Sequence, residues 1–186
     1  LDTHYQDGSI LSGHVSHKNV PGVEFSTGSL GHGLSVGSGI ALGIKKKNAK
    51  QNVCVLLSDG ECDEGSIWEA AMFSSHHKLN NLLAIVDYNK LQSLESVSST
   101  LELEPFSEKW KSFGWHVVEI NGHDFREMKT AFETCKLTKD KPSIIIAHTI
   151  KGKGVAYAEG KPEWHHKSKL SHHDIKKMYD SIQQYN

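Results

Sequence analysis

The chain has 186 residues, of which 37% are hydrophobic and 23% are charged, and its formal net charge is −1. These values are ordinary for a soluble globular domain with its own core, and they exclude the strongly basic character of most nucleic-acid-binding proteins. No apolar run reaches transmembrane length and no charged-then-apolar leader is present, so we expect no membrane association. The three cysteines lack a C-x-x-C pair, which argues against a disulfide framework and favours a reducing, cytoplasmic location.

The segment from Leu1 to Val23 is polar and is interrupted by glycine and proline. It has no start signal for a helix or a strand, as expected for a chain that begins inside a domain. Three histidines lie in this segment, and histidines in a polar loop are more often solvated than functional. His14, which follows Gly13, is the one candidate for a functional role.

Residues 25–50 indicate a glycine-rich loop that enters a helix. The loop carries the closely spaced glycines Gly28, Gly31 and Gly33, and the helix carries Gly37, Gly39 and Gly43. The loop glycines let another backbone or a flat ligand come close, although a loop with tight helix packing is an equally weighted alternative. Each helix glycine costs about 1 kcal/mol relative to Ala in an exposed helix, so we expect this helix to be packed tightly.

A run of apolar, partly β-branched residues starts at Val53 and is followed directly by an acidic residue and a glycine, Asp59 and Gly60. In open α/β sheets, ligands bind beyond the carboxyl ends of parallel strands. An acidic residue there can hold a hard cation, and a glycine after it lets the backbone approach a phosphate. An Asp-Gly pair alone is more often a turn, so the prediction depends on the strands and the helix around it.

A second apolar run begins at Leu82 and ends at Asn89. Residues 64–79 supply the helical crossover that a parallel strand pair requires. The expected buried stripe of this helix is Ile67, Ala70, Ala71 and Phe73. Asp59 and Asn89 can therefore become neighbours. One carboxylate, one amide oxygen and a backbone carbonyl just past Asn89 would suit Mg²⁺ and leave room for a diphosphate.

The second half of the chain repeats the alternation of strands and helices. We expect an irregular serine-rich loop over 90–100, a short helix from Pro105 to Gly114, a strand over 115–120, a helix capped by Asp124 through about Thr138, and a strand over 142–149. Four strands alternating with helices predict an α/β fold, a three-layer parallel sheet with helices on both faces.

The last strand is followed by Ile150–Val155, in which lysine and glycine alternate. The lysine charges and the flexible backbone make this stretch suitable for binding an anion. The chain after this stretch is interpreted as a polar tail with two pairs of adjacent histidines. Zinc is not favoured there, because no cysteine is nearby and adjacent histidines do not share a helix face. Since the sequence has no internal repeat and no long linker, we expect a single domain over residues 1–186.

Seven short motifs occur in a fixed order along the chain. They are Gly13–His14, Pro21–Gly33, Ser58–Gly65, Val86–Gln92, Gly122–Asp124, Lys151–Gly154 and Trp164–His165. In order and spacing they resemble the diphosphate-binding (N-terminal) module of transketolase, and they look most like the N-terminal subunit of split, two-chain transketolases. The resemblance implies the thiamine diphosphate-binding fold of that module.

The resemblance also implies a site for thiamine diphosphate and Mg²⁺, or a similar ion such as Ca²⁺ or Mn²⁺. The side chains of Asp59 and Asn89 and the carbonyl of Leu91 would hold the ion, and Gly60 would approach the diphosphate. The cofactor-binding residues implied in this way are Gly28, Ser29, Leu30, Gly60, Glu61, Asn89, Lys151 and His165.

The activity implied is transfer of a two-carbon ketol unit from a ketose to an aldose, with phosphorylated or related sugars as substrates. His14 and His165 match histidines that face the sugar and are the candidate catalytic residues. Glu64 matches an acidic residue at the subunit interface. The glutamate that activates the cofactor belongs to a pyrimidine-binding module absent from this chain, so we expect a partner module or C-terminal subunit and a dimer or higher assembly.

The sequence departs from the family pattern at several positions. Ser58 replaces the first glycine of Gly-Asp-Gly, Val15 replaces a proline, His32 replaces a common glutamine, and His166 replaces the glycine after His165. Two histidines that the family supplies from upstream are also absent, as in a truncated module. These departures concern the substrate more than the cofactor.

Two further interpretations stay open beside the transketolase one. The chain could belong to another thiamine-dependent enzyme, such as a deoxyxylulose-phosphate synthase or a dehydrogenase α subunit, or to a non-catalytic binding module. The joint occurrence of Ser29–Gly33 and Lys151–Gly154 disfavours the first of these. The second stays open because the activating glutamate lies elsewhere.

Overall fold

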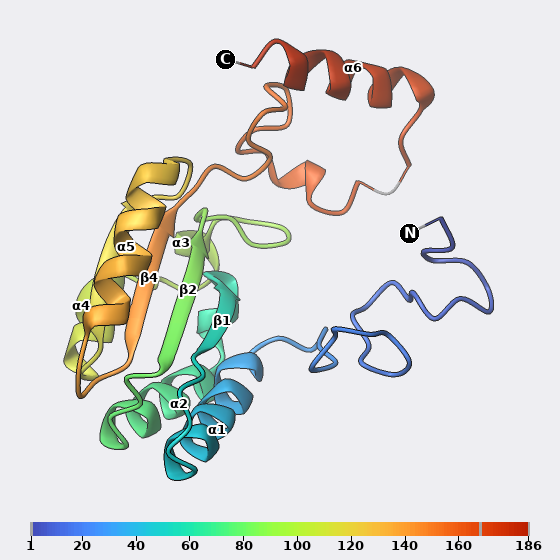
Figure 1. The fold of residues 1–186 in the computed structure, drawn as a ribbon. Coiled ribbons are helices and arrows are strands. Elements are labelled where there is room, and N and C mark those ends of the chain that lie inside the picture. The colour runs from blue at the N-terminus through green and yellow to red at the C-terminus, as the bar shows by residue number, and fades with distance from the viewer. Residues whose placement is uncertain (1, 168, 186) are drawn as a thin grey trace.

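The computed structural model describes residues 2–167 and 169–185. Its strands are β1 (Val53–Ser58), β2 (Leu82–Tyr88), β3 (His116–Asn121) and β4 (Ser143–His148). They form one sheet in the order β1-β2-β4-β3, and each neighbouring pair is parallel (Figure 1). The predicted strands and their parallel arrangement are confirmed.

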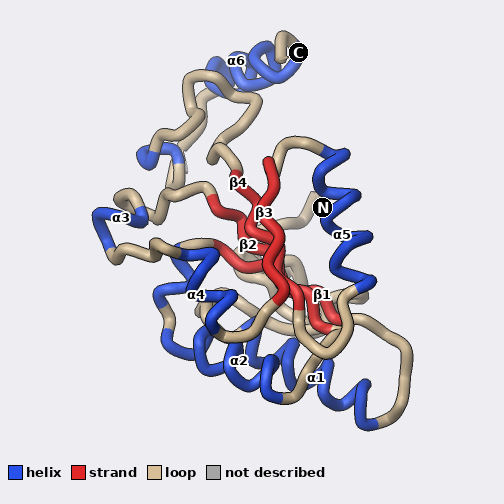
Figure 2. The backbone as a smooth tube through the Cα atoms, turned by 90° about the vertical axis from the view of Figure 1, so that its left-hand side faces the viewer, coloured by secondary structure: helices blue, strands red, loops and turns tan. Residues whose placement is uncertain are grey.

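Helices cover both faces of this sheet. The predicted helices are found as α1 (Gly33–Lys46), α2 (Gly65–His76), α4 (Phe106–Ser112) and α5 (Phe125–Leu137). Shorter turns are η1 (Gly60–Asp63), α3 (Val97–Thr100) and η2 (Pro162–Trp164), and a last helix is α6 (His172–Gln183). Figure 2 shows α1, α2 and α4 on one side of the sheet and α5 on the other. The predicted three-layer α/β fold is therefore confirmed.

Two hydrophobic cores hold the layers together. The larger core lies between the sheet and α1, α2 and α4, and it includes Leu34, Leu57, Ile67, Val86, Phe106, Trp110 and Ile144. The smaller core lies under α5 and consists of Ile120, Ala131, Cys135, Ile145 and Ala147. Because β2 and β4 contribute to cores on both faces, the central strands are fixed from two sides.

Local signals in the sequence explain most helix positions. The Asp124 carboxylate accepts hydrogen bonds from the N–H groups of Arg126 (2.7 Å) and Glu127 (3.2 Å), which is the predicted N-cap of α5. In α2 the predicted stripe is confirmed for Ile67, Ala70 and Ala71 but is wrong for Phe73, which is 41% exposed. The small residue Ser74 completes the stripe instead, because it lies one helical turn after Ala70.

The expected tight packing of α1 depends on one glycine. A Cβ atom at Gly37 would lie 2.5 Å from Cγ2 of Val55, so α1 approaches β1 more closely than any other residue would allow. At Gly39 and Gly43 a Cβ atom would meet nothing within 4 Å. The predicted tight packing is therefore confirmed at Gly37, which faces the sheet, and is wrong at Gly39 and Gly43.

The interpretation of the C-terminal stretch as a polar tail is incomplete, because the stretch contains α6. The Ser171 hydroxyl accepts from the N–H of Asp174 (3.1 Å) and the Asp174 carboxylate accepts from the N–H of Ser171 (2.9 Å), which is a capping box. Among the described helices, none is long and apolar enough to cross a membrane. The thiols of Cys54, Cys62 and Cys135 are free.

Candidate functional site

The ends of β1 and β2 meet through one buried carboxylate. Ser58 and Asp87 are paired in the parallel register, so the residues that follow each strand are neighbours. Asp59 is only 1% exposed. Its Oδ1 accepts from the N–H of Gly60 (2.7 Å) and its Oδ2 accepts from the N–H of Lys90 (2.5 Å). The Asp59 carboxylate therefore joins the two strand ends, as the spacing predicted.

The environment of this carboxylate suits a cation. Burial raises the pKa of Asp59, and the nearby Asp87 carboxylate acts in the same direction. The N–H groups of Lys90 and Gly60 and the ammonium group of Lys151 lower the pKa and offset this only in part. A hard cation beside Asp59 would supply the missing positive charge at close range, so the residues present fit a metal ion.

Asn89 and Leu91 lie in the same cavity as Asp59. The amide oxygen of Asn89 accepts from the N–H of Leu91 (3.0 Å), and its Nδ2 donates to Asp87 (3.3 Å), which fixes the orientation of the amide. An amide oxygen has a second lone pair that stays available. Within 2–167 and 169–185 no three His, Cys, Asp or Glu side chains gather to hold a metal. The predicted metal ligands are not such a cluster, because they combine one carboxylate, from Asp59, with the Asn89 amide oxygen and the Leu91 carbonyl.

A cavity of about 530 Å³ opens at this edge of the sheet. It brings together nine of the predicted site residues: Leu30, Asp59, Gly60, Glu61, Glu64, Asn89, Leu91, Lys151 and His165. Its wall also contains residues that the sequence did not assign to the site: Ser58, Gln92, Ser93, Leu94, Glu95 and Thr100. All of these except Ser58 belong to the serine-rich loop over residues 90–100, which the sequence predicts as irregular.

Glu61 connects the glycine-rich loop to the end of β1. Its Oε1 accepts from the N–H of Gly31 (2.8 Å) and its Oε2 accepts from the N–H of Ser58 (3.2 Å). Gly31 has a φ of +87°, which favours glycine, and its carbonyl accepts from the hydroxyl of Ser66 (2.6 Å). These bonds place Leu30 on the wall of the cavity.

The remaining predicted residues, His14, Gly28 and Ser29, lie outside this cavity. They line a separate hollow of about 690 Å³ together with Phe25, Ser26, Thr27 and His32. A Cβ atom at Gly28 would lie 2.6 Å from the His14 ring, so the absence of a side chain at Gly28 makes room for the imidazole. The glycine-rich loop therefore contributes to both spaces, with Leu30 facing the main cavity.

Lys151 and His165 reach the cavity from the chain that follows β4. At the start of this stretch, the N–H of Ile150 donates to Nε2 of His123 (2.8 Å). Burial lowers the pKa of His165, and the positive charge of Lys151 and the neighbouring His166 add to the effect. His165 is therefore biased toward the neutral imidazole, which can either donate or accept a proton.

Comparison with known proteins gives consistent matches. Residues 1–183 match the family model described as transketolase, thiamine diphosphate binding domain. The chain is 47% identical over 165 residues to one of the subunits of the apulose-4-phosphate transketolase of Phocaeicola vulgatus, covering 89% of this chain and 58% of the relative. It is 42% identical over 161 residues to a 6-deoxy-6-sulfo-D-fructose transketolase subunit of a Clostridium species, covering 87% and 58%.

The fold matches solved transketolases as well. The crystal structure of transketolase from Campylobacter jejuni superposes with a TM-score of 0.90 at 31% identity, covering 98% of this chain and 29% of that chain. The chain thus spans a little over half the length of the split relatives and under a third of the one-chain enzyme. The predicted resemblance is confirmed: the chain belongs to the transketolase family and corresponds to its thiamine diphosphate-binding domain.

Proposed function

We propose that this chain anchors the diphosphate of thiamine diphosphate through Mg²⁺, or a similar ion such as Ca²⁺ or Mn²⁺, in an enzyme that transfers a two-carbon ketol unit from a ketose to an aldose. The observation that carries the proposal is the buried Asp59 carboxylate where two parallel strands end, beside Asn89. Asp59, Asn89 and the Leu91 carbonyl would hold the ion, and Gly60 would approach the diphosphate. The bound cofactor supplies the carbanion chemistry of such transfers.

The protein's own residues then bind, orient and handle protons. Lys151 would bind the diphosphate with its ammonium group, and His165 would donate to the diphosphate or to the substrate. His14 would hydrogen-bond the sugar, with Gly28 and Ser29 beside it. Glu61 would act by positioning the loop that carries Leu30, since both of its oxygens already accept backbone N–H groups.

Activity would require a second module. The relatives named as subunits of transketolases support a separate pyrimidine-binding partner, and Glu64 is exposed at the edge of the cavity, where a partner could contact it. We include in the proposal a dimer or higher assembly and phosphorylated or related sugar substrates. We also include a cytoplasmic location, and the free cysteines support this location alone.

The test is a reconstitution. This chain is assayed by itself and after mixing with a pyrimidine-binding partner module, with thiamine diphosphate, Mg²⁺ and a panel of ketose and aldose phosphates. We expect transfer only in the mixture. Transfer by the isolated chain would contradict the two-module proposal, and cofactor binding without transfer from any sugar would favour a non-catalytic module.

A further inference from the structure

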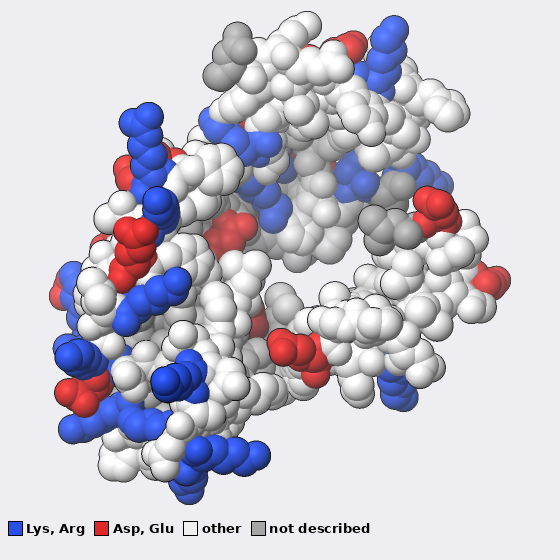
Figure 3. Space-filling view, viewed as in Figure 1, with Lys and Arg blue, Asp and Glu red and all other residues white. Residues whose placement is uncertain are grey.

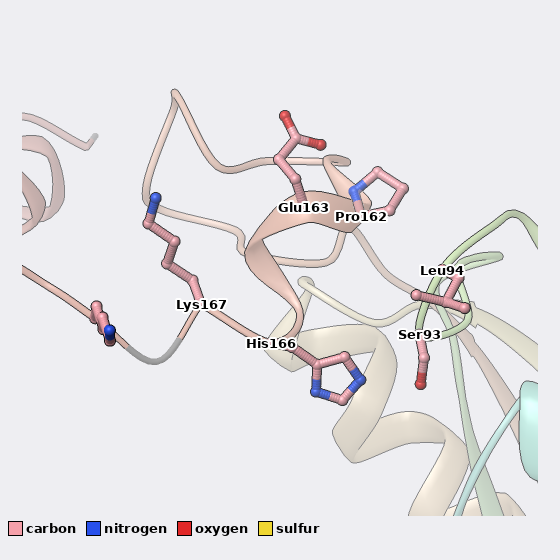
Figure 4. Close-up of a pocket in the computed structure, with 7 residues that line it drawn as sticks. Ser93, Leu94, Pro162, Glu163, His166 and Lys167 are labelled. Carbon is pink, nitrogen blue, oxygen red and sulfur yellow. The ribbon is translucent and has the colours of Figure 1, made fainter.

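The C-terminal segment, residues 150–185, carries Lys151 and His165 to the wall of the cofactor cavity at the strand ends. Figure 3 shows lysine or arginine side chains on this part of the chain, on the side that faces the hollow next to the sheet. The segment and the serine-rich loop also line a second cavity, of about 530 Å³, with Ser93, Leu94, Pro162, Glu163, His166, Lys167 and Lys169 (Figure 4). How these groups lie relative to the strand ends depends on the residue that joins β4 to the segment.

That residue is Thr149, which is held by the ends of both strands that neighbour β4. Its N–H donates to the carbonyl of Tyr88 (3.3 Å), and its hydroxyl donates to Oδ1 of Asp87. A Cβ atom at Gly122 would lie 2.5 Å from Cγ2 of Thr149, so the absence of a side chain at Gly122 makes room for this methyl group. A β-branched side chain has few rotamers. Thr149 therefore directs its hydroxyl to the end of β2 and its methyl to the end of β3.

The end of β3 also holds the residues on both sides of Thr149. The N–H of Gly122 donates to the carbonyl of His148 (2.8 Å). Nε2 of His123 accepts from the N–H of Ile150 (2.8 Å). Both contacts come from the Gly-His-Asp motif of the family pattern, to which the proposed function assigns no role. The motif therefore fixes the backbone that carries the Thr149 hydroxyl.

The Asp87 carboxylate connects Thr149 to the predicted cation ligand Asn89. Oδ1 of Asp87 accepts from the Thr149 hydroxyl and also from Nδ2 of Asn89 (3.3 Å). An ionised carboxylate only accepts hydrogen bonds, so it binds the NH₂ group of the amide and leaves the amide oxygen to other partners. Asp87 is exposed, and the Thr149 hydroxyl holds its carboxylate against rotation toward water.

We propose that Thr149 is a positioning residue for the cofactor's cation, and that it acts through Asp87 by keeping the amide oxygen of Asn89 directed to the ion. The inference rests on the proposed function, because it assumes that Asn89 binds a cation that holds the diphosphate. Partners of this kind orient the ligands of a metal, and their loss typically lowers metal affinity by about 10- to 100-fold. Thr149 also lies two residues before Lys151, so the same residue holds the start of the stretch that carries this lysine.

The test titrates thiamine diphosphate into the chain mixed with a pyrimidine-binding partner module, once with Mg²⁺ and once with a chelator. Thr149→Val removes the hydroxyl and keeps the methyl at Gly122, whereas Thr149→Ser keeps the hydroxyl. The control Thr134→Val removes an exposed hydroxyl of α5 that donates within its own helix, to the carbonyl of Thr130 (2.8 Å).

Thr149→Val should weaken cofactor binding about tenfold with Mg²⁺, the lower end of the range for outer-shell partners of a metal. With the chelator it should bind the cofactor as the wild type does, because the hydroxyl acts only through a cation ligand. A purely structural role would lower the affinity under both conditions. Thr149→Ser and Thr134→Val should keep the wild-type affinity under both.

Asp87→Ala is the second variant, because Asp87 is exposed and its loss should leave the fold intact. It should weaken Mg²⁺-dependent binding at least as much as Thr149→Val does. Combining the two substitutions should give no further loss, as expected when one residue acts through the other.

Equal effects of Thr149→Val and Thr149→Ser, a loss that persists with the chelator, additive effects of Thr149→Val and Asp87→Ala, or no change in Thr149→Val would overturn the inference. Each of these results would leave the proposed function in place. If cofactor binding by the wild type does not depend on Mg²⁺, the cation site of the proposed function fails and the inference fails with it.

Discussion

The two walls of the cofactor cavity are built in different ways. One wall is formed by the ends of β1 and β2, where the buried Asp59 carboxylate joins backbone groups from both strand ends. The other wall belongs to the C-terminal segment, residues 150–185. Beyond Ile150, the hydrogen bonds formed by its described residues stay within the segment, such as those from Tyr157 to Asp174 and from Ser181 to Gly154.

The two walls differ in how firmly the rest of the fold holds them, and this suits them to different parts of a ligand. The sheet ladder and two cores determine where the first wall lies, so it suits the part of a ligand that never changes, the cofactor diphosphate. The second wall is joined to the sheet by hydrogen bonds only where it begins. The N–H of Ile150 donates to His123, and the hydroxyl of Thr149 donates to Asp87. We expect substitutions in the first wall to abolish binding and substitutions in the second to have graded effects.

Asp59→Ala should have the largest effect. Loss of the carboxylate should weaken Mg²⁺-dependent binding of thiamine diphosphate by more than about 100-fold, beyond the range seen when only an outer-shell partner is removed. Calorimetry in the presence of the partner module measures the affinity, and urea unfolding should still show one cooperative transition. The control is Asp180→Ala, an exposed carboxylate of α6. Unchanged cofactor affinity in Asp59→Ala would refute the assignment of this wall.

His165→Ala should have a smaller effect, because it removes one contact from the second wall. Loss of a hydrogen bond to a charged group should weaken cofactor binding or turnover by about tenfold to a hundredfold. His172→Ala, an exposed histidine on α6, should change neither. Steady-state kinetics of the reconstituted enzyme distinguish the two variants, and equal effects would place His165 outside the site.

Gly31→Ala tests how the glycine-rich loop is held to the first wall. Gly31 has a φ of +87°, and a Cβ atom there would lie 2.8 Å from Glu64 side-chain atoms. The left-handed backbone alone costs about 1–2 kcal/mol. The control Gly8→Ala has a similar φ of +80° but meets nothing within 4 Å. Gly31→Ala should lower the free energy of unfolding more than Gly8→Ala does, as measured with urea, and an equal loss would contradict the contact.

The smallest expected effect is a pH dependence of stability in the absence of cofactor and cation. Because burial raises the pKa of Asp59, the native state retains a proton that the unfolded chain releases, so this group contributes stability at low pH that is lost as the pH rises through the raised pKa. The free energy of unfolding of the wild type, relative to Asp59→Asn, should therefore fall as the pH rises from about 4 to 7. A difference that does not change with pH would contradict this account.

The sequence predicted the strand-end wall well for a physical reason. A hydrophobic run that ends in acid and glycine, followed by a helix of crossover length and a second such run, leaves few arrangements for Asp59 and Asn89 other than adjacent strand ends. Exposure of Phe73 was missed because a small residue, Ser74, occupies the buried position one turn after Ala70.

The C-terminal segment was harder to predict, although signals for α6 were present. The capping pair Ser171 and Asp174 and the apolar spacing of Ile175, Tyr179 and Ile182 are typical of a helix start and an amphipathic face. The cavity beside His166 could not be predicted from spacing, because it depends on how the serine-rich loop and η2 approach each other in space.

The central claim is that Asp59 and Asn89 hold the cofactor through a cation, and the most direct test is to measure how cofactor affinity depends on that cation. Thiamine diphosphate is titrated into the reconstituted wild type and Asn89→Ala, each with saturating Mg²⁺ and with a chelator. Chelation should weaken binding by at least about tenfold in the wild type and should have little further effect in Asn89→Ala, since the variant has already lost an ion ligand. Equal weakening by the chelator in both proteins would contradict the claim.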